Sequence, residues 1–165
     1  RLMRAALLSA RARAGTDAVL ARVRAAVARH AEVAGEFDVN EELPAGLRAD
    51  RAVVVGGDGT IMAALRQFVD RGVPVVGVNI GRLGFLAEFD AAEFERHAAQ
   101  VLGPSPAVRE RMALSVQVRG ADGATRYEGL AVNDAVVTAG APFRMIELAL
   151  RLEEAFMRLT KGMVA

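Results

Sequence analysis

Three glycines surround one aspartate in the run GGDGT at residues 56–60, which directly follows the β-branched segment 52–55. A glycine-rich loop between a strand and a helix lets the backbone approach a phosphate, and the N–H groups at the helix start favour an anion there. A carboxylate repels phosphates unless it accepts a proton from an attacking hydroxyl or holds a metal ion, and both roles belong to phosphoryl transfer. The alternative is a tight turn in which glycine supplies a positive φ and Asp58 caps the helix.

A second glycine-rich segment, NIGRLGFL at residues 79–86, follows the strand-like run 74–78. Open α/β sheets bind ligands at the carboxyl ends of their strands, so two such loops after neighbouring strands would line one crevice. Ordinary turn chemistry, with Phe85 and Leu86 filling the core, is the alternative. Neither loop matches the G-x-G-x-x-G fingerprint or the Walker-type phosphate loop.

A pair of polar residues, Asn133 and Asp134, interrupts the apolar stretch 130–137. An amide and a carboxylate side by side suit hydrogen bonds to ribose hydroxyls. A bulge or turn explains the same two residues, and spacing alone favours that alternative.

Strands and helices alternate in the first two thirds of the chain, which predicts βαβ units and a parallel sheet. The pattern then changes to alternating apolar and polar residues, which predicts an antiparallel hairpin and a further strand. We therefore expect an α/β domain over residues 1–105 and the start of a β domain over residues 106–165. The expected helices span residues 16–30, 61–69 and 90–102; the expected strands span residues 4–10, 33–39, 52–55, 74–78, 112–119, 125–137 and 144–152.

The amino-acid composition limits the kinds of binding partner that we expect for this chain. The 165 residues are 53% hydrophobic and 25% charged, which predicts a packed globule, and the net charge of +1 comes without a basic block, which argues against nucleic acid. Apolar runs fall short of the roughly 18 residues of a membrane span, so we expect no membrane association. Cysteine is absent, which fits the cytoplasm as the default compartment. His30 and His97 lie far apart without ligand-like neighbours, so no metal centre is predicted.

The three motifs in this order, residues 55–60, residues 79–86 and Asn133-Asp134, resemble those of NAD kinases. The resemblance covers about residues 2–152. It implies transfer of the terminal phosphate of ATP, or of polyphosphate, to the 2′-hydroxyl of the adenosine ribose of NAD, giving NADP. It also implies Mg²⁺ with the phosphate donor, a Rossmann-like α/β domain followed by a β-sandwich-like domain, and a homodimer or homotetramer.

The same resemblance assigns roles to individual residues. Asp58 would accept the proton of the 2′-hydroxyl. The residues that would contact NAD are Asp58, Gly59, Asn133, Asp134 and Arg144. Those that would shape the phosphate site are Gly56, Gly57 and Thr60, and those that would line the pocket are Asn79 and Phe85.

The sequence also departs from the family. The family continues into a further β region that holds NAD, and residues 153–165 match nothing in it, so we expect the chain to be incomplete at its C-terminal side. Ala63 stands where the family often has a polar side chain, and Arg66 lies one helical turn further on. A lipid kinase of the diacylglycerol type, which shares the GGDGT run, and a non-catalytic nucleotide-binding fragment are the alternatives.

Overall fold

The computed structural model describes residues 2–10, 15–81, 84–132 and 134–141. Five strands form one parallel sheet in the order β2-β1-β3-β4-β5, and two more form a separate antiparallel sheet. The strands are β1 (Arg4–Ser9), β2 (Glu32–Asp38), β3 (Arg51–Val55), β4 (Val75–Asn79), β5 (Phe89–Asp90), β6 (Ala113–Arg119) and β7 (Thr125–Val132). The helices are α1 (Thr16–His30), α2 (Asp58–Phe68), the 3-10 turn η1 (Val69–Arg71) and α3 (Ala91–Val101).

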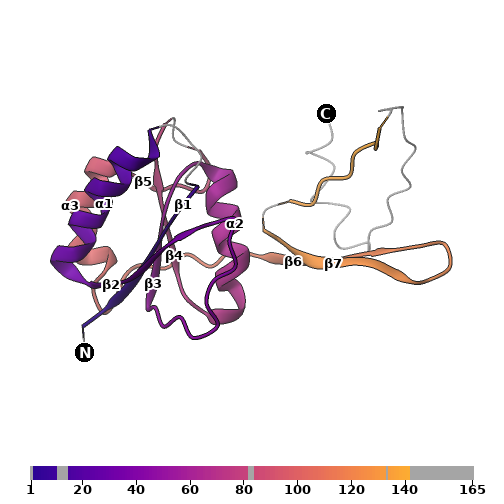
Figure 1. Cartoon of the computed structure of the whole chain (residues 1–165), viewed down its shortest axis with the longest axis horizontal. Helices are drawn as coiled ribbons and strands as arrows, with labels where there is room; N and C mark the ends of the chain where they lie inside the picture. Colours follow the sequence, from indigo (N-terminus) through magenta and orange to yellow (C-terminus); the bar gives the residue numbers. More distant parts are fainter. Residues whose placement is uncertain (1, 11–14, 82–83, 133, 142–165) are drawn as a thin grey trace. The chain divides into compact units, whose positions relative to one another are not determined.

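The parallel sheet is covered on both faces, with α1 and α3 on one side and α2 on the other (Figure 1). Alternate residues of the central strands point to opposite faces, as the two-residue period of a strand requires. Leu7 packs in the cluster beneath α1 and α3, whereas Leu8 packs in the cluster beneath α2, and both are fully buried. Burial on both faces explains why the strands read as continuous apolar runs.

The strand order places β1 between β2 and β3, so the chain first builds outward on one side of β1 and then crosses to the other. In doubly wound sheets the crevice for a ligand lies where this direction changes, outside the carboxyl ends of the strands. Ala10, which follows β1, and the loop after β3 therefore lie at that point. The pairing of β3 with β4 brings the loop after β4 to the same edge.

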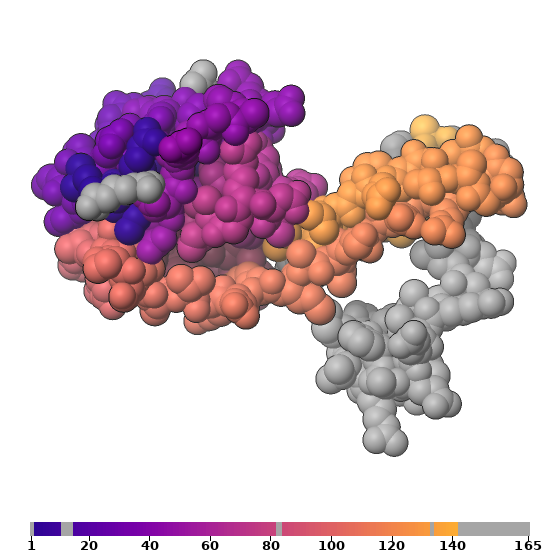
Figure 2. Space-filling view, turned by 90° about the horizontal axis from the view of Figure 1, so that it is seen from below, coloured from indigo at the N-terminus to yellow at the C-terminus, as the bar shows by residue number. Residues whose placement is uncertain are grey.

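A hairpin, β6–β7, confirms the antiparallel pattern expected after residue 106. Its turn has Gly123 at a φ of 80°, a left-handed conformation that glycine adopts without strain. The contacts between residues divide the chain into two units, Arg1–Asp134 and Ala135–Ala165. Figure 2 shows the chain in space-filling form. The domain boundary predicted near residue 105 stays a prediction. No helix in the described part of the chain is long and apolar enough to cross a membrane.

The helix and strand boundaries differ from expectation in a few places. The strand predicted over 125–137 ends at Val132, and α2 begins at Asp58 instead of Ile61. The two-residue strand β5 was not predicted, because two residues carry no detectable period. The strand expected over residues 144–152 lies outside the described residues.

Candidate active site

The loop between β3 and α2 is short because the hydrogen bonds of the sheet and those of the helix both extend into it. The N–H of Gly56 still donates to Val78 O on β4 at 2.9 Å, and the carbonyl of Gly57 already accepts the N–H of Thr60 at 2.9 Å and of Ile61 at 3.1 Å. Only Gly56 and Gly57 lie between β3 and α2. The N–H groups at the start of α2 consequently face the carboxyl edge of the sheet, which is the arrangement that favours an anion.

Gly56 of this loop is required for space and not for a positive φ. Positive φ values among the described residues occur at Gly15, Gly35, Gly72 and Gly123, none of which belongs to the GGDGT run. A Cβ on Gly56 would lie 2.6 Å from Cγ2 and Oγ1 of Thr60, which is buried. The alternative, a turn in which these glycines supply a positive φ, is therefore wrong.

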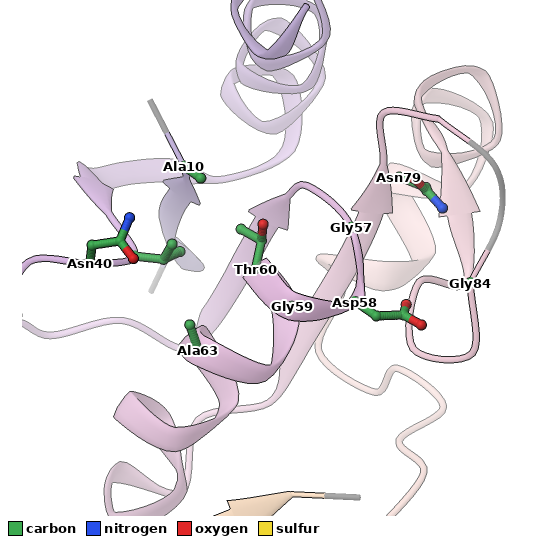
Figure 3. Close-up of a pocket in the computed structure, with 10 residues that line it drawn as sticks. Ala10, Asn40, Gly57, Asp58, Gly59, Thr60, Ala63, Asn79 and Gly84 are labelled. Carbon is green, nitrogen blue, oxygen red and sulfur yellow. The ribbon is translucent and has the colours of Figure 1, made fainter. Parts of the chain in front are cut away.

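Asp58 is the first residue of α2, and its carboxylate does not cap that helix; the N-cap is Gly57, without a side-chain hydrogen bond. Instead each carboxylate oxygen accepts one backbone N–H from the loop after β4. Phe85 N–H donates to Oδ2 at 2.9 Å, and Leu86 N–H donates to Oδ1 at 3.1 Å. In Figure 3 the carboxylate of Asp58 points toward Gly84 and away from Ala63. Asp58 thus joins the two glycine-rich loops.

The loop after β4 begins with a local turn at Asn79. This residue ends β4, is 6% exposed, and its Oδ1 accepts the N–H of Gly81 at 2.9 Å. Asparagine favours such turns because its side chain can replace a backbone acceptor. Further along the same loop, residues 84–86 lie beside Asp58.

A cavity of about 500 Å³ lies at this edge of the sheet. Its lining comes from the ends of four strands, as the strand order requires. The predicted residues Gly57, Asp58, Gly59, Thr60 and Asn79 all line it, and so does Ala63, where the family often has a polar side chain. Residues that sequence reasoning missed are Ala10, Val39, Asn40 and Gly84. The sequence predicted strands that end at Ala10 and Val39, but it did not predict the strand order that brings these ends to the cavity.

Other predicted residues are placed differently. The side chain of Phe85 is 91% exposed and is not part of the described cavity lining, so only its backbone meets Asp58. Asp134 is exposed and does not belong to that lining. Arg66, on the helical turn after Ala63, is also exposed. Asn133 and Arg144 lie outside the described residues.

The charge pairs with resolved pKa shifts join α1 to α3 and α1 to β2, and none of their residues lines the described cavity. Hydrogen bonds from Arg22 on α1 lower the pKa of Glu95 on α3, and the charge of Arg22 acts in the same direction. A hydrogen bond with Glu36 raises the pKa of Arg24. Within the described ranges, no group of three His, Cys, Asp or Glu side chains could hold a metal ion.

The fold and this crevice define an α/β protein of the doubly wound class with a glycine loop at the switch point. The profile of the ATP-NAD kinase N-terminal domain matches residues 18–105, which is more than half of the chain. The chain therefore belongs to the ATP-NAD kinase family.

Individual relatives agree with this assignment. The chain is 45% identical to the NAD kinase of Nitratidesulfovibrio vulgaris over 108 residues, covering 66% of this chain and 38% of that protein. It is 38% identical to the NAD kinase of Acetivibrio thermocellus over 128 residues, covering 77% of this chain and 43% of that protein. The chain thus spans about two fifths of the length of these curated relatives.

A solved structure shares the fold. The crystal structure of yeast NADH kinase complexed with NADH superposes with a TM-score of 0.59 at 18% sequence identity, covering 79% of this chain and 46% of that one. The likeness confirms the predicted combination of a parallel α/β sheet with antiparallel strands after it.

Proposed function

We propose that this chain is the nucleotide-binding part of an NAD kinase that phosphorylates the 2′-hydroxyl of the adenosine ribose of NAD. The observation that carries the proposal is the position of Asp58. It is the one carboxylate among the described lining residues of the 500 Å³ cavity, and it lies at the start of α2 beside the glycine loop. Family membership favours a dinucleotide over a lipid as the phosphate acceptor.

The proposed reaction gives each part of the site a task. The 2′-hydroxyl oxygen attacks the terminal phosphorus of ATP, the bond from that phosphorus to the bridging oxygen breaks, and ADP leaves. The hydroxyl proton passes to the carboxylate of Asp58, and NADP forms. N–H groups at the start of α2 stabilise the phosphate charge, while Gly56 keeps the loop close to Thr60. Polyphosphate would donate its terminal phosphate in the same way, and the leaving group would be the chain shortened by one phosphate.

Mg²⁺ fits the described residues only as an ion carried by the phosphate donor. Nucleotide-bound Mg²⁺ uses one or two carboxylates together with phosphate oxygens, and Asp58 is the carboxylate that the described lining offers. When bound, the ion would compensate the negative charge of the phosphates.

The remaining contacts to NAD are proposed for Gly59, Asn133, Asp134 and Arg144, and pocket contacts for Asn79 and Phe85. We also propose a cytoplasmic homodimer or homotetramer. Because the chain spans about two fifths of its relatives, activity belongs to the complete gene product.

A coupled assay tests the proposal. The complete gene product is given ATP, Mg²⁺ and NAD, and NADP is measured with an NADP-specific dehydrogenase. Formation of NADP by the parent and its loss in Asp58→Asn support the proposal. Absence of NADP in the parent, with calorimetry still detecting NAD or ATP, would instead identify a nucleotide-binding protein without turnover.

A further inference from the structure

The loop after β4 passes Asp58 at a distance that only glycine permits. An ideal Cβ on Gly84 would lie 2.5 Å from both Cγ and Oδ2 of the Asp58 carboxyl group. Real Cβ atoms essentially never approach so closely, so a side chain at position 84 and the present position of Asp58 exclude one another.

The backbone of Gly84 does not itself require glycine. Its φ lies outside the left-handed region in which other residues are strained. Alanine is therefore acceptable to the local chain conformation, and its effect would come from the contact with Asp58 alone.

The carboxylate cannot move aside without loss. Both of its oxygens accept N–H groups of Phe85 and Leu86, which follow Gly84 directly. A displaced carboxylate would lose at least one of these two hydrogen bonds and would change its direction relative to the cavity. A carboxylate offers about four acceptor positions, so two remain for a substrate hydroxyl while the N–H groups fix the orientation.

We propose that Gly84 is a positioning residue, which leaves the space that lets Phe85 and Leu86 hold the Asp58 carboxylate in the direction needed to accept the hydroxyl proton. This inference rests on the proposed kinase function. Gly84 itself touches neither reacting group in this scheme and acts through Asp58.

The first test compares Gly84→Ala with Gly81→Ala in the complete gene product. Gly81 lies in the same loop, is exposed, and has open space where its Cβ would be. We expect Gly84→Ala to lower kcat about 10- to 100-fold, the effect of a misplaced reacting group, with KM for NAD within about threefold of the parent. Gly81→Ala should behave like the parent. Parental kcat in Gly84→Ala, or an equal loss in Gly81→Ala, would overturn the inference.

A double-mutant cycle covers the case in which Gly84→Ala fails to fold. With Asp58→Ala the clashing carboxyl group is gone, so adding Gly84→Ala should leave Tm unchanged, whereas it lowers Tm in the parent background. A loss of Tm that persists with Asp58→Ala would show that Gly84 is needed for another reason.

A spectroscopic measurement separates this inference from the proposed function. In ¹H–¹⁵N spectra the amide signals of Phe85 and Leu86 should both move when Asp58 is replaced by alanine in the parent, because both amides donate to its carboxylate. The same replacement should no longer move them in the Gly84→Ala background, where the carboxylate is already displaced. If the parent makes no NADP but these shifts are present, the kinase assignment fails and the positioning of Asp58 by Gly84 stands. If the amide signals do not respond to the loss of Asp58, the inference fails even in an active enzyme.

Discussion

The N–H of Phe85 donates a 2.9 Å hydrogen bond to Oδ2 of Asp58, which precedes it by 27 residues. The bond links the loop after β4 to the loop after β3, and the parallel pairing of these strands makes the approach possible. The acidic group is thus neither enclosed by hydrocarbon nor left in open solvent. It lines a cavity at the edge of the sheet where doubly wound proteins bind their ligands.

Asp58→Asn is expected to lower kcat for NADP formation about 10²- to 10⁴-fold, because the amide cannot accept the hydroxyl proton. The amide NH₂ would also face one of the two N–H donors on Phe85 and Leu86. Asp70→Asn is the matched control, since Asp70 is exposed on η1. The measurement is the initial rate of NADP formation with saturating ATP and NAD. Equal rates in the two variants would show that Asp58 does not take part in the reaction.

Gly56→Ala is expected to destabilise the fold by about 1–3 kcal/mol, because its Cβ would overlap Thr60. Thr60 is buried and β-branched, so its side chain has little freedom to move away. Gly59→Ala, in the first turn of the same helix, meets open space and should leave stability unchanged or raise it by up to about 1 kcal/mol. Thermal unfolding compares the Tm of Gly56→Ala with that of Gly59→Ala. A Tm loss of the same size in both variants would contradict the claim that Gly56 leaves space for Thr60.

Ala63→Phe is expected to weaken nucleotide binding about tenfold or more, equivalent to about 1.4 kcal/mol, because the ring would occupy the cavity. Ala99→Phe makes the same change on α3 at an exposed position and should bind like the parent. Isothermal titration with ATP and with NAD measures both affinities. Undiminished affinity of Ala63→Phe for both ligands would place the nucleotides elsewhere.

The pair between Arg22 and Glu95 is expected to add a small, salt-sensitive stabilisation that is lost in acid. Hydrogen bonds of 3.0 and 3.2 Å from Arg22 lower the pKa of Glu95 in the folded state. The stabilisation is therefore complete above the unfolded pKa of a glutamate and disappears as the pH falls through the lower folded value. Both side chains are partly exposed, which keeps the effect small.

An NMR titration of the Glu95 carboxyl carbon measures this pKa directly. Arg22→Gln should raise the pKa of Glu95 toward the ordinary glutamate value. Arg24→Gln, on the same helix but paired with Glu36, should leave it unchanged. An unchanged pKa in Arg22→Gln would show that the pair does not persist in solution.

Much of the architecture was readable from local patterns. The helix at residues 16–30 was predicted with the bounds that α1 has, and β1 to β4, β6 and the start of α2 were placed within three residues. The end of β7 was predicted five residues too late, and β5 was not predicted. Apolar periodicity and β-branched runs are properties of neighbouring residues, so they can be read directly from the sequence. At the start of α3 the structure adds a capping box between Asp90 and Glu93, a contact between residues three positions apart.

The amino-acid sequence by itself determined which segments form strands and helices and which loops carry glycines, an aspartate and an asparagine. The tertiary structure alone decided that β1 lies between β2 and β3, which adds Ala10 and Asn40 to the cavity. It also decided that Asp58 binds the backbone after Gly84 instead of capping its own helix. Both outcomes depend on contacts between residues far apart in the chain, which strand pairing creates and no local pattern encodes.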